Sequence, residues 1–139
     1  MIDLATGAPC PEAPTTDVKQ HGSAVAEFVM VTAVLTAVFV SVLQLAVVLH
    51  VRNTLLDAAA AGARFGTLAD RSPAEGADRT RSIISESLSP RFAEGVTFES
   101  TTIGGNAAVR VTVATGFPLM GFLPVAGDLR VHGEAVRYG

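Results

Sequence analysis

The chain has 139 residues, of which 49% are hydrophobic and only 17% charged, and its formal net charge is −3. No basic patch stands out, which argues against nucleic acid as a partner, and Cys10, the lone cysteine, cannot form an internal disulfide. Four acids accompany one lysine in residues 1–27, whereas nine acids and nine arginines cancel in residues 52–139.

Residues 1–22 are predicted to form a flexible leader. They contain three prolines and scattered acids, and they follow neither a helical nor a strand period. We therefore expect the leader to stand apart from the folded part of the chain.

Residues 23–69 predict a single long helix, half in lipid and half in water. From Phe28 to Leu49 there is no charged side chain, and 18 of these 22 residues are apolar. At about 1.5 Å rise per residue the run is roughly 33 Å long, enough to cross a hydrocarbon core of about 30 Å. The sequence therefore predicts one transmembrane span over about residues 28–50, with the lipid bilayer as a partner.

Beyond His50 the same helix is predicted to continue as an amphipathic segment. Its polar flank holds Arg52, Asn53, Asp57 and Arg64, and its apolar flank holds Leu55, Leu56, Ala59 and Ala63. The alanines at positions 58–61 are the best helix formers available, so no break is expected there.

Residues 70–139 are predicted to form a small α+β head. Ser72-Pro73-Ala74-Glu75 is typical of a helix start, with serine as N-cap and glutamate closing a capping box, and this helix should stop before Pro90. Residues 96–103 and 107–115, joined by a Gly-Gly-Asn turn, predict two strands of a hairpin, and residues 129–138 predict a third. The expected fold is thus a long helix, a second short helix and an antiparallel sheet of about three strands.

Two sets of small residues recur at every fourth position and suggest helix packing faces. They are Ala33, Ala37 and Ser41 in the span, and Ala58, Gly62 and Gly66 beyond it. Such spacing lets helices approach closely, although it also arises by chance in an alanine-rich chain. Our hypothesis is that the second set contacts either the sheet of the head or another subunit.

Residues 116–127 form an uncharged, apolar connection, which is unusual for a surface loop. We expect it to fold back over the sheet; the alternative is a contact with the lipid interface or a partner.

Enzymatic constellations are missing from the sequence. The three histidines, His21, His50 and His132, lack the spacing of metal ligands, and no phosphate-binding glycine loop occurs. We expect neither catalysis nor a cofactor nor a metal.

Glu27 stands directly before the uncharged run. It either lies in the headgroup region, where an acid costs little, or has a specific partner. The segment Gly22-Ser23-Ala24-Val25-Ala26-Glu27 resembles the type III signal of prepilin-like proteins. This resemblance implies cleavage between Gly22 and Ser23 by a membrane aspartyl peptidase, the prepilin peptidase. It also implies that Glu27 pairs with the freed amine of a neighbouring subunit.

The segment at 58–66, which contains Gly62-Ala63-Arg64, and the ending at 116–137 resemble TadE-like proteins in order and spacing. The resemblance implies a minor pilin or pseudopilin of a tight-adherence (Flp, type IVc) pilus. Other pilin subunits and the pilus assembly platform would be its partners.

Two alternatives remain open. Residues 28–49 are the h-region of a signal peptide in a secreted protein, or the chain is a membrane-anchored surface binding protein outside any filament. Orientation is also ambiguous, because Arg52 and Arg64 against Lys19 favour a cytoplasmic head, whereas the resemblance implies an external one. We follow the resemblance and expect an external head.

Overall fold

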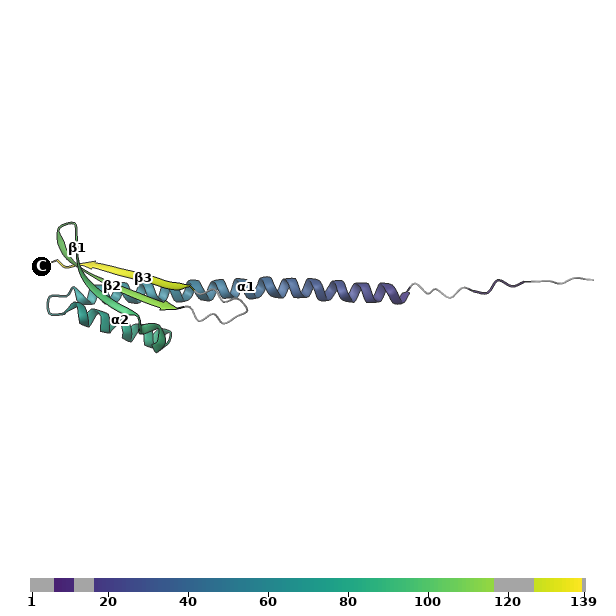
Figure 1. The fold of residues 1–139 in the computed structure, drawn as a ribbon, viewed down its shortest axis with the longest axis horizontal. Coiled ribbons are helices and arrows are strands. Elements are labelled where there is room, and N and C mark those ends of the chain that lie inside the picture. Colours follow the sequence, from purple (N-terminus) through teal and green to yellow (C-terminus); the bar gives the residue numbers. More distant parts are fainter. Residues whose placement is uncertain (1–6, 12–16, 117–126, 139) are drawn as a thin grey trace, which may run out of the picture. The chain divides into compact units, whose positions relative to one another are not determined.

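A computed structural model of the chain describes residues 7–11, 17–116 and 127–138. Its elements are helix α1 (Asp17–Gly66), helix α2 (Pro73–Ser87), the short 3-10 helix η1 (Pro90–Ala93), and strands β1 (Val96–Ile103), β2 (Asn106–Gly116) and β3 (Asp128–Val136) (Figure 1). A long N-terminal helix, a short second helix and a three-stranded antiparallel sheet confirm the α+β prediction. The chain divides into two compact units, Met1–Leu43 and Gln44–Gly139, and α1 contributes to both.

The first unit differs from the sequence expectation at the start of α1. The helix begins at Asp17 rather than at residue 23, so residues 17–22 of the predicted leader are helical. The last proline of the leader is Pro14, and no residue after it breaks a helix. The Gly22–Ser23 peptide bond therefore lies in helical backbone.

The part of α1 that lies in the first unit is apolar and unburied. All residues from Gly22 to Leu43 are exposed, and Phe28 keeps 71% of its accessible surface. By length and composition, one helix of the described residues, Gly22–Gly66, could cross a membrane, and its apolar N-terminal part lies in this unit. The small residues Ala33, Ala37 and Ser41 lie here, and the Ser41 hydroxyl donates a hydrogen bond to the Ala37 carbonyl at 2.7 Å.

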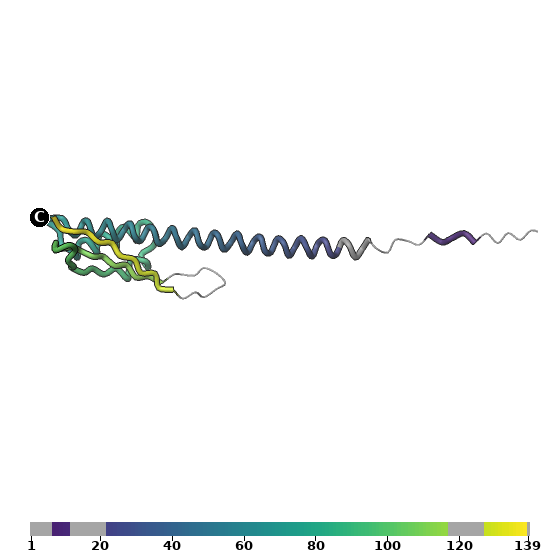
Figure 2. The backbone as a smooth tube through the Cα atoms, turned by 90° about the horizontal axis from the view of Figure 1, so that it is seen from above, coloured from purple at the N-terminus to yellow at the C-terminus, as the bar shows by residue number. Residues whose placement is uncertain are grey.

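In the second unit the C-terminal part of α1 enters a hydrophobic core. Leu55, Ala59 and Ala63 are fully buried and Leu56 is half-buried, as the predicted apolar flank requires. Figure 2 shows β3 alongside this part of the helix. The compact unit thus starts at Gln44, well before the predicted head boundary at residue 70, because the core of the head includes the helix.

The sheet is an antiparallel meander in the order β1-β2-β3. On β2, Val109, Val111 and Val113 face the core, whereas Arg110 lies on the opposite, solvent-facing side with Glu134 at 2.5 Å. The alternation matches the predicted half-buried strand. Strands β1 and β2 are joined by Gly104 and Gly105, whose φ angles of 57° and 84° are those of a two-residue I′ turn.

Helix α2 starts at the predicted capping box. The Ser72 hydroxyl accepts a hydrogen bond from the Glu75 N–H at 3.3 Å, and the Glu75 carboxylate accepts one from the Ser72 N–H at 2.7 Å. Helix α2 ends at Ser87, before Pro90 as expected. The prediction for the apolar connection at 116–127 concerns residues 117–126, which lie outside the described residues.

The capping box makes the stability of the head depend on pH. The hydrogen bond from the Ser72 N–H, helped by Arg71, lowers the pKa of Glu75 below its usual 4.5. A lowered carboxyl pKa gives stabilisation that is complete above the usual value and is lost as pH falls through the lowered one. The melting temperature of the Glu75→Gln variant should therefore fall less steeply with decreasing pH than that of the wild type. Glu94→Gln, at another exposed acid, should keep the wild-type slope; equal slopes in all three proteins would contradict the assignment.

Candidate functional site

The residues predicted for processing and assembly lie together near the start of α1. Ser23 and Glu27 are four positions apart on a helix, so they occupy one face, separated by about 6 Å along the axis. Both are exposed, and Glu27 has no ion-pair partner among the described residues. The next charged side chain along α1 in the sequence is Arg52.

With this arrangement, the Glu27 carboxylate can bind a cation at the end of the uncharged, apolar segment of α1. A carboxylate without a partner is expensive in a poorly hydrated environment, on the order of 2.5–3.5 kcal/mol, so it favours a site where a cation is available. Within the described residues no group of three His, Cys, Asp or Glu side chains is placed to hold a metal.

The face formed by Ala58, Gly62 and Gly66 packs against helix α2, a partner that the sequence hypothesis did not name. A Cβ atom built on Gly62 would lie 2.5 Å from the Gly76 carbonyl oxygen, and one built on Gly76 would lie 2.5 Å from the Gly62 carbonyl oxygen. The two backbones are therefore in direct contact. The buried Thr80 hydroxyl completes the contact, 3.0 Å from the Gly76 carbonyl and 3.3 Å from the Ala58 carbonyl.

Sequence reasoning missed a second close contact, between α1 and the sheet. A Cβ atom on Gly133 of β3 would lie 2.4 Å from the backbone of Ala59 and Ala60. A glycine inside a strand often marks such an approach of another backbone, which was the available signal. Arg137, just after β3, adds hydrogen bonds to the carbonyls of Gly66 and Arg71 at 3.3 and 3.0 Å.

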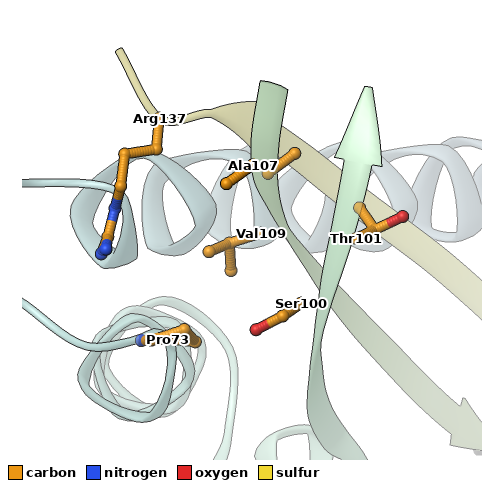
Figure 3. A pocket seen from close by; sticks show the side chains of 7 residues that line it. Pro73, Ser100, Thr101, Ala107, Val109 and Arg137 are labelled. Carbon is orange, nitrogen blue, oxygen red and sulfur yellow. The ribbon is translucent and has the colours of Figure 1, made fainter. Parts of the chain in front are cut away.

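A small cavity of about 90 Å³ lies between the start of α2 and the hairpin (Figure 3). It is lined by Pro73, Ser100, Thr101, Ala107, Ala108, Val109 and Arg137. The guanidinium of Arg137, the charged group of this lining, already donates to two backbone carbonyls. No base lies beside the Ser100 hydroxyl among these residues, so the cavity offers no nucleophile–base pair.

Residues 22–64 match the family model described as TadE-like protein. No curated protein and no solved structure gives a significant match. The matched segment begins at Gly22 and includes Glu27 and Gly62, whereas the head from residue 65 onward lies outside it. This match confirms the resemblance to the TadE-like family, and with the long apolar helix it fits a Tad-pilus-associated, pilin-like protein.

Proposed function

We propose that this protein is a TadE-like minor pilin or pseudopilin, processed by prepilin peptidase and assembled into, or at the base of, a tight-adherence pilus. It crosses the membrane once, its head is outside the cell, and it has no catalytic role. One observation carries the proposal: Gly22 and Glu27 directly precede an uncharged, unburied helix within the TadE-like segment.

Processing creates the charge that Glu27 binds. Cleavage after Gly22 leaves an α-ammonium on Ser23, which needs a counter-charge wherever water is scarce. A carboxylate from an adjoining subunit satisfies it with a charge-assisted hydrogen bond and sets the axial register of the two helices. Because the bond to be cut lies in helical backbone, the peptidase must unwind the first turns of α1, and glycine lowers that cost by about 1 kcal/mol relative to alanine.

The packing of the head argues against the secreted alternative. A signal peptidase cut near residues 58–61 would remove Val51, Leu55 and Ala58, three buried residues of the head core. Loss of a single large buried side chain costs about 2–5 kcal/mol, so the remaining fragment would lack a stable core. The helix is therefore an integral part of the head rather than a removable signal.

Mass spectrometry of the protein purified from membranes tests the processing step. We expect an N-terminus at Ser23, which leaves 139 − 22 = 117 residues, and we expect Gly22→Leu to block the cut and preserve the full chain. Ala24→Leu, two positions away, is the matched control and should still be processed. Retention of Met1 in a chain that stays solitary in the bilayer would instead indicate the membrane-anchored binding protein.

A further inference from the structure

Strand β1 is an open edge of the sheet. It pairs with β2 on one side, and among the described elements no strand pairs with its other side. Its sequence contains neither proline nor lysine, two residues that often protect an edge strand from pairing with another chain, and its one charged side chain is Glu99. Phe98 lies on the core-facing side of β1, yet it keeps 47% of its surface exposed.

The register shows which backbone groups of β1 are available. The Gly95 carbonyl accepts a hydrogen bond from the Ala114 N–H, so odd-numbered residues of β1 bond to β2 and even-numbered residues point outward. The outward carbonyl of Val96 is taken by the Arg81 guanidinium at 2.8 Å. Phe98, Ser100 and Thr102 therefore present their N–H and C=O groups to an incoming strand.

The same reasoning applies to β3, the opposite edge. The Arg137 N–H donates to the Ala107 carbonyl, so odd-numbered residues bond to β2 and even-numbered residues point outward. On β1 the outward-pointing residues carry core-facing side chains, whereas on β3 they carry solvent-facing ones such as Arg130 and His132. In an antiparallel pair, the side chains of two hydrogen-bonded residues lie on the same face of the sheet. Antiparallel pairing of β1 with β3 of a second copy would therefore put the helices of the two copies on opposite faces of the joined sheet.

Parallel pairing removes this conflict. In a parallel pair, a residue whose backbone groups bond to the neighbouring strand lies opposite a residue whose backbone groups point away from that strand. Even-numbered residues of β1 therefore lie opposite odd-numbered residues of β3, and the side chains of both sets face the core. The helix layers then share one face and α1 runs the same way in both copies. Antiparallel pairing of β1 with β1 would reverse α1, which is incompatible with two chains anchored in one membrane.

We propose that β1 of one copy binds β3 of a second copy in parallel, so that the sheets join head to tail. This rests on the proposed function insofar as both chains share a membrane. Such a heterologous contact does not close on itself and suits a filament or linear array. Measured across the strands, the repeat would be three strand spacings, about 14 Å. Each copy also places α1 and α2 side by side on one face of the sheet. The backbone contact between Gly62 and Gly76 brings these two helices close together, so that the width of the pair approaches this repeat.

Charge favours the register in which Glu99 lies opposite Arg130 of the second copy. The Glu99 side chain is 69% exposed and its nearest cation, Arg110, is 3.9 Å away and already bound to Glu134. Arg130 has no ion pair within the described part of the chain. This register also covers Phe98 with the helix layer of the second copy and sets Thr101 opposite His132.

Disulfide cross-linking on whole cells that make the full chain tests the contact. In a Cys10→Ala background, the double variant Thr101→Cys/His132→Cys should give a ladder of dimers, trimers and higher species on a non-reducing gel. Either single variant should stay monomeric. Within one chain the two positions are two strand spacings apart, about 9.6 Å, and they are also offset by four residues along the strands, so they lie well beyond the reach of a disulfide of about 7 Å. A ladder therefore reports contact between chains.

A second variant tests the register. Arg130→Gln should weaken the ladder about two- to fivefold, the size of an exposed ion pair, whereas Arg64→Gln, at an exposed arginine of α1, should not change it. Dimers from Thr101→Cys alone, or no ladder, would overturn the proposal. The N-terminal mass of the same sample separates the two proposals: a Ser23 terminus without a ladder rejects only the strand pairing, and a ladder with a Met1 terminus rejects only the processing.

Discussion

Replacing Gly62 with alanine should destabilise the head by about 1–3 kcal/mol or more, because the added methyl group has no space. Its Cβ atom would lie 1.8 Å from the Thr80 hydroxyl and 2.5 Å from the Gly76 carbonyl oxygen. The threonine can rotate, but a backbone carbonyl cannot move unless the two helices separate. Separation would expose the alanines of the core and break the hydrogen bond from the Thr80 hydroxyl to the Ala58 carbonyl. Thermal unfolding of the full chain in detergent measures the loss.

The matched control for this prediction is Gly116→Ala. No atom lies within 4 Å of a Cβ built on Gly116, so this variant should stay within about 0.5 kcal/mol of wild type. Gly62→Ala/Thr80→Ala should recover only part of the loss, because the Gly76 carbonyl remains in the way. If the melting temperature of Gly62→Ala equalled that of Gly116→Ala, the backbone contact between α1 and α2 would not be the constraint described above.

Glu27→Ala should leave cleavage intact but reduce assembled protein on the order of 100-fold. Without the carboxylate, the Ser23 ammonium of a neighbouring subunit enters a poorly hydrated environment unpaired, at a cost on the order of 2.5–3.5 kcal/mol. A difference of 1.4 kcal/mol is tenfold in an equilibrium, which sets the size of the effect. The measurement is the fraction of processed chain in sheared pili relative to the membrane pool.

Conservative changes at the same position separate charge from shape. Glu27→Gln keeps the size but loses the charge and should behave like alanine, whereas Glu27→Asp keeps the charge and should recover part of the assembly. Glu94→Ala removes an exposed acid in the head and serves as the control for net charge. Assembly of Glu27→Ala at the wild-type level would sink the counter-charge mechanism, even if the cleavage site proved right.

Several elements were predictable because their causes lie within a few residues. The capping box is a reciprocal hydrogen bond between Ser72 and Glu75, and both partners are visible in four consecutive letters. The hairpin follows from two glycines with positive φ between alternating runs. The candidate site was identified from the sequence in the same way, because Gly22, Glu27 and the uncharged run are neighbours in sequence, and its role in processing and assembly stays a prediction.

Other features depended on residues far apart in the chain. The early start of α1 at Asp17 was missed because the prolines of the leader dominated its composition. The small-residue face that includes Gly62 was recognised, but its partner α2 was not. A helix face of small residues can pack against several kinds of surface, and the sequence does not say which one. Gly133 was missed altogether, because a glycine in a strand does not say which backbone approaches it.

The sequence by itself determined the apolar rod, the acid at its border, and the order of helices and strands, because these follow from local hydrogen bonding and side-chain periodicity. Only the tertiary structure decided that α1 is a core element of the head, that α2 and β3 meet it at glycines, and that no described strand pairs with the outer side of β1. Those outcomes depend on which surfaces bury each other best, and that choice is made between segments tens of residues apart.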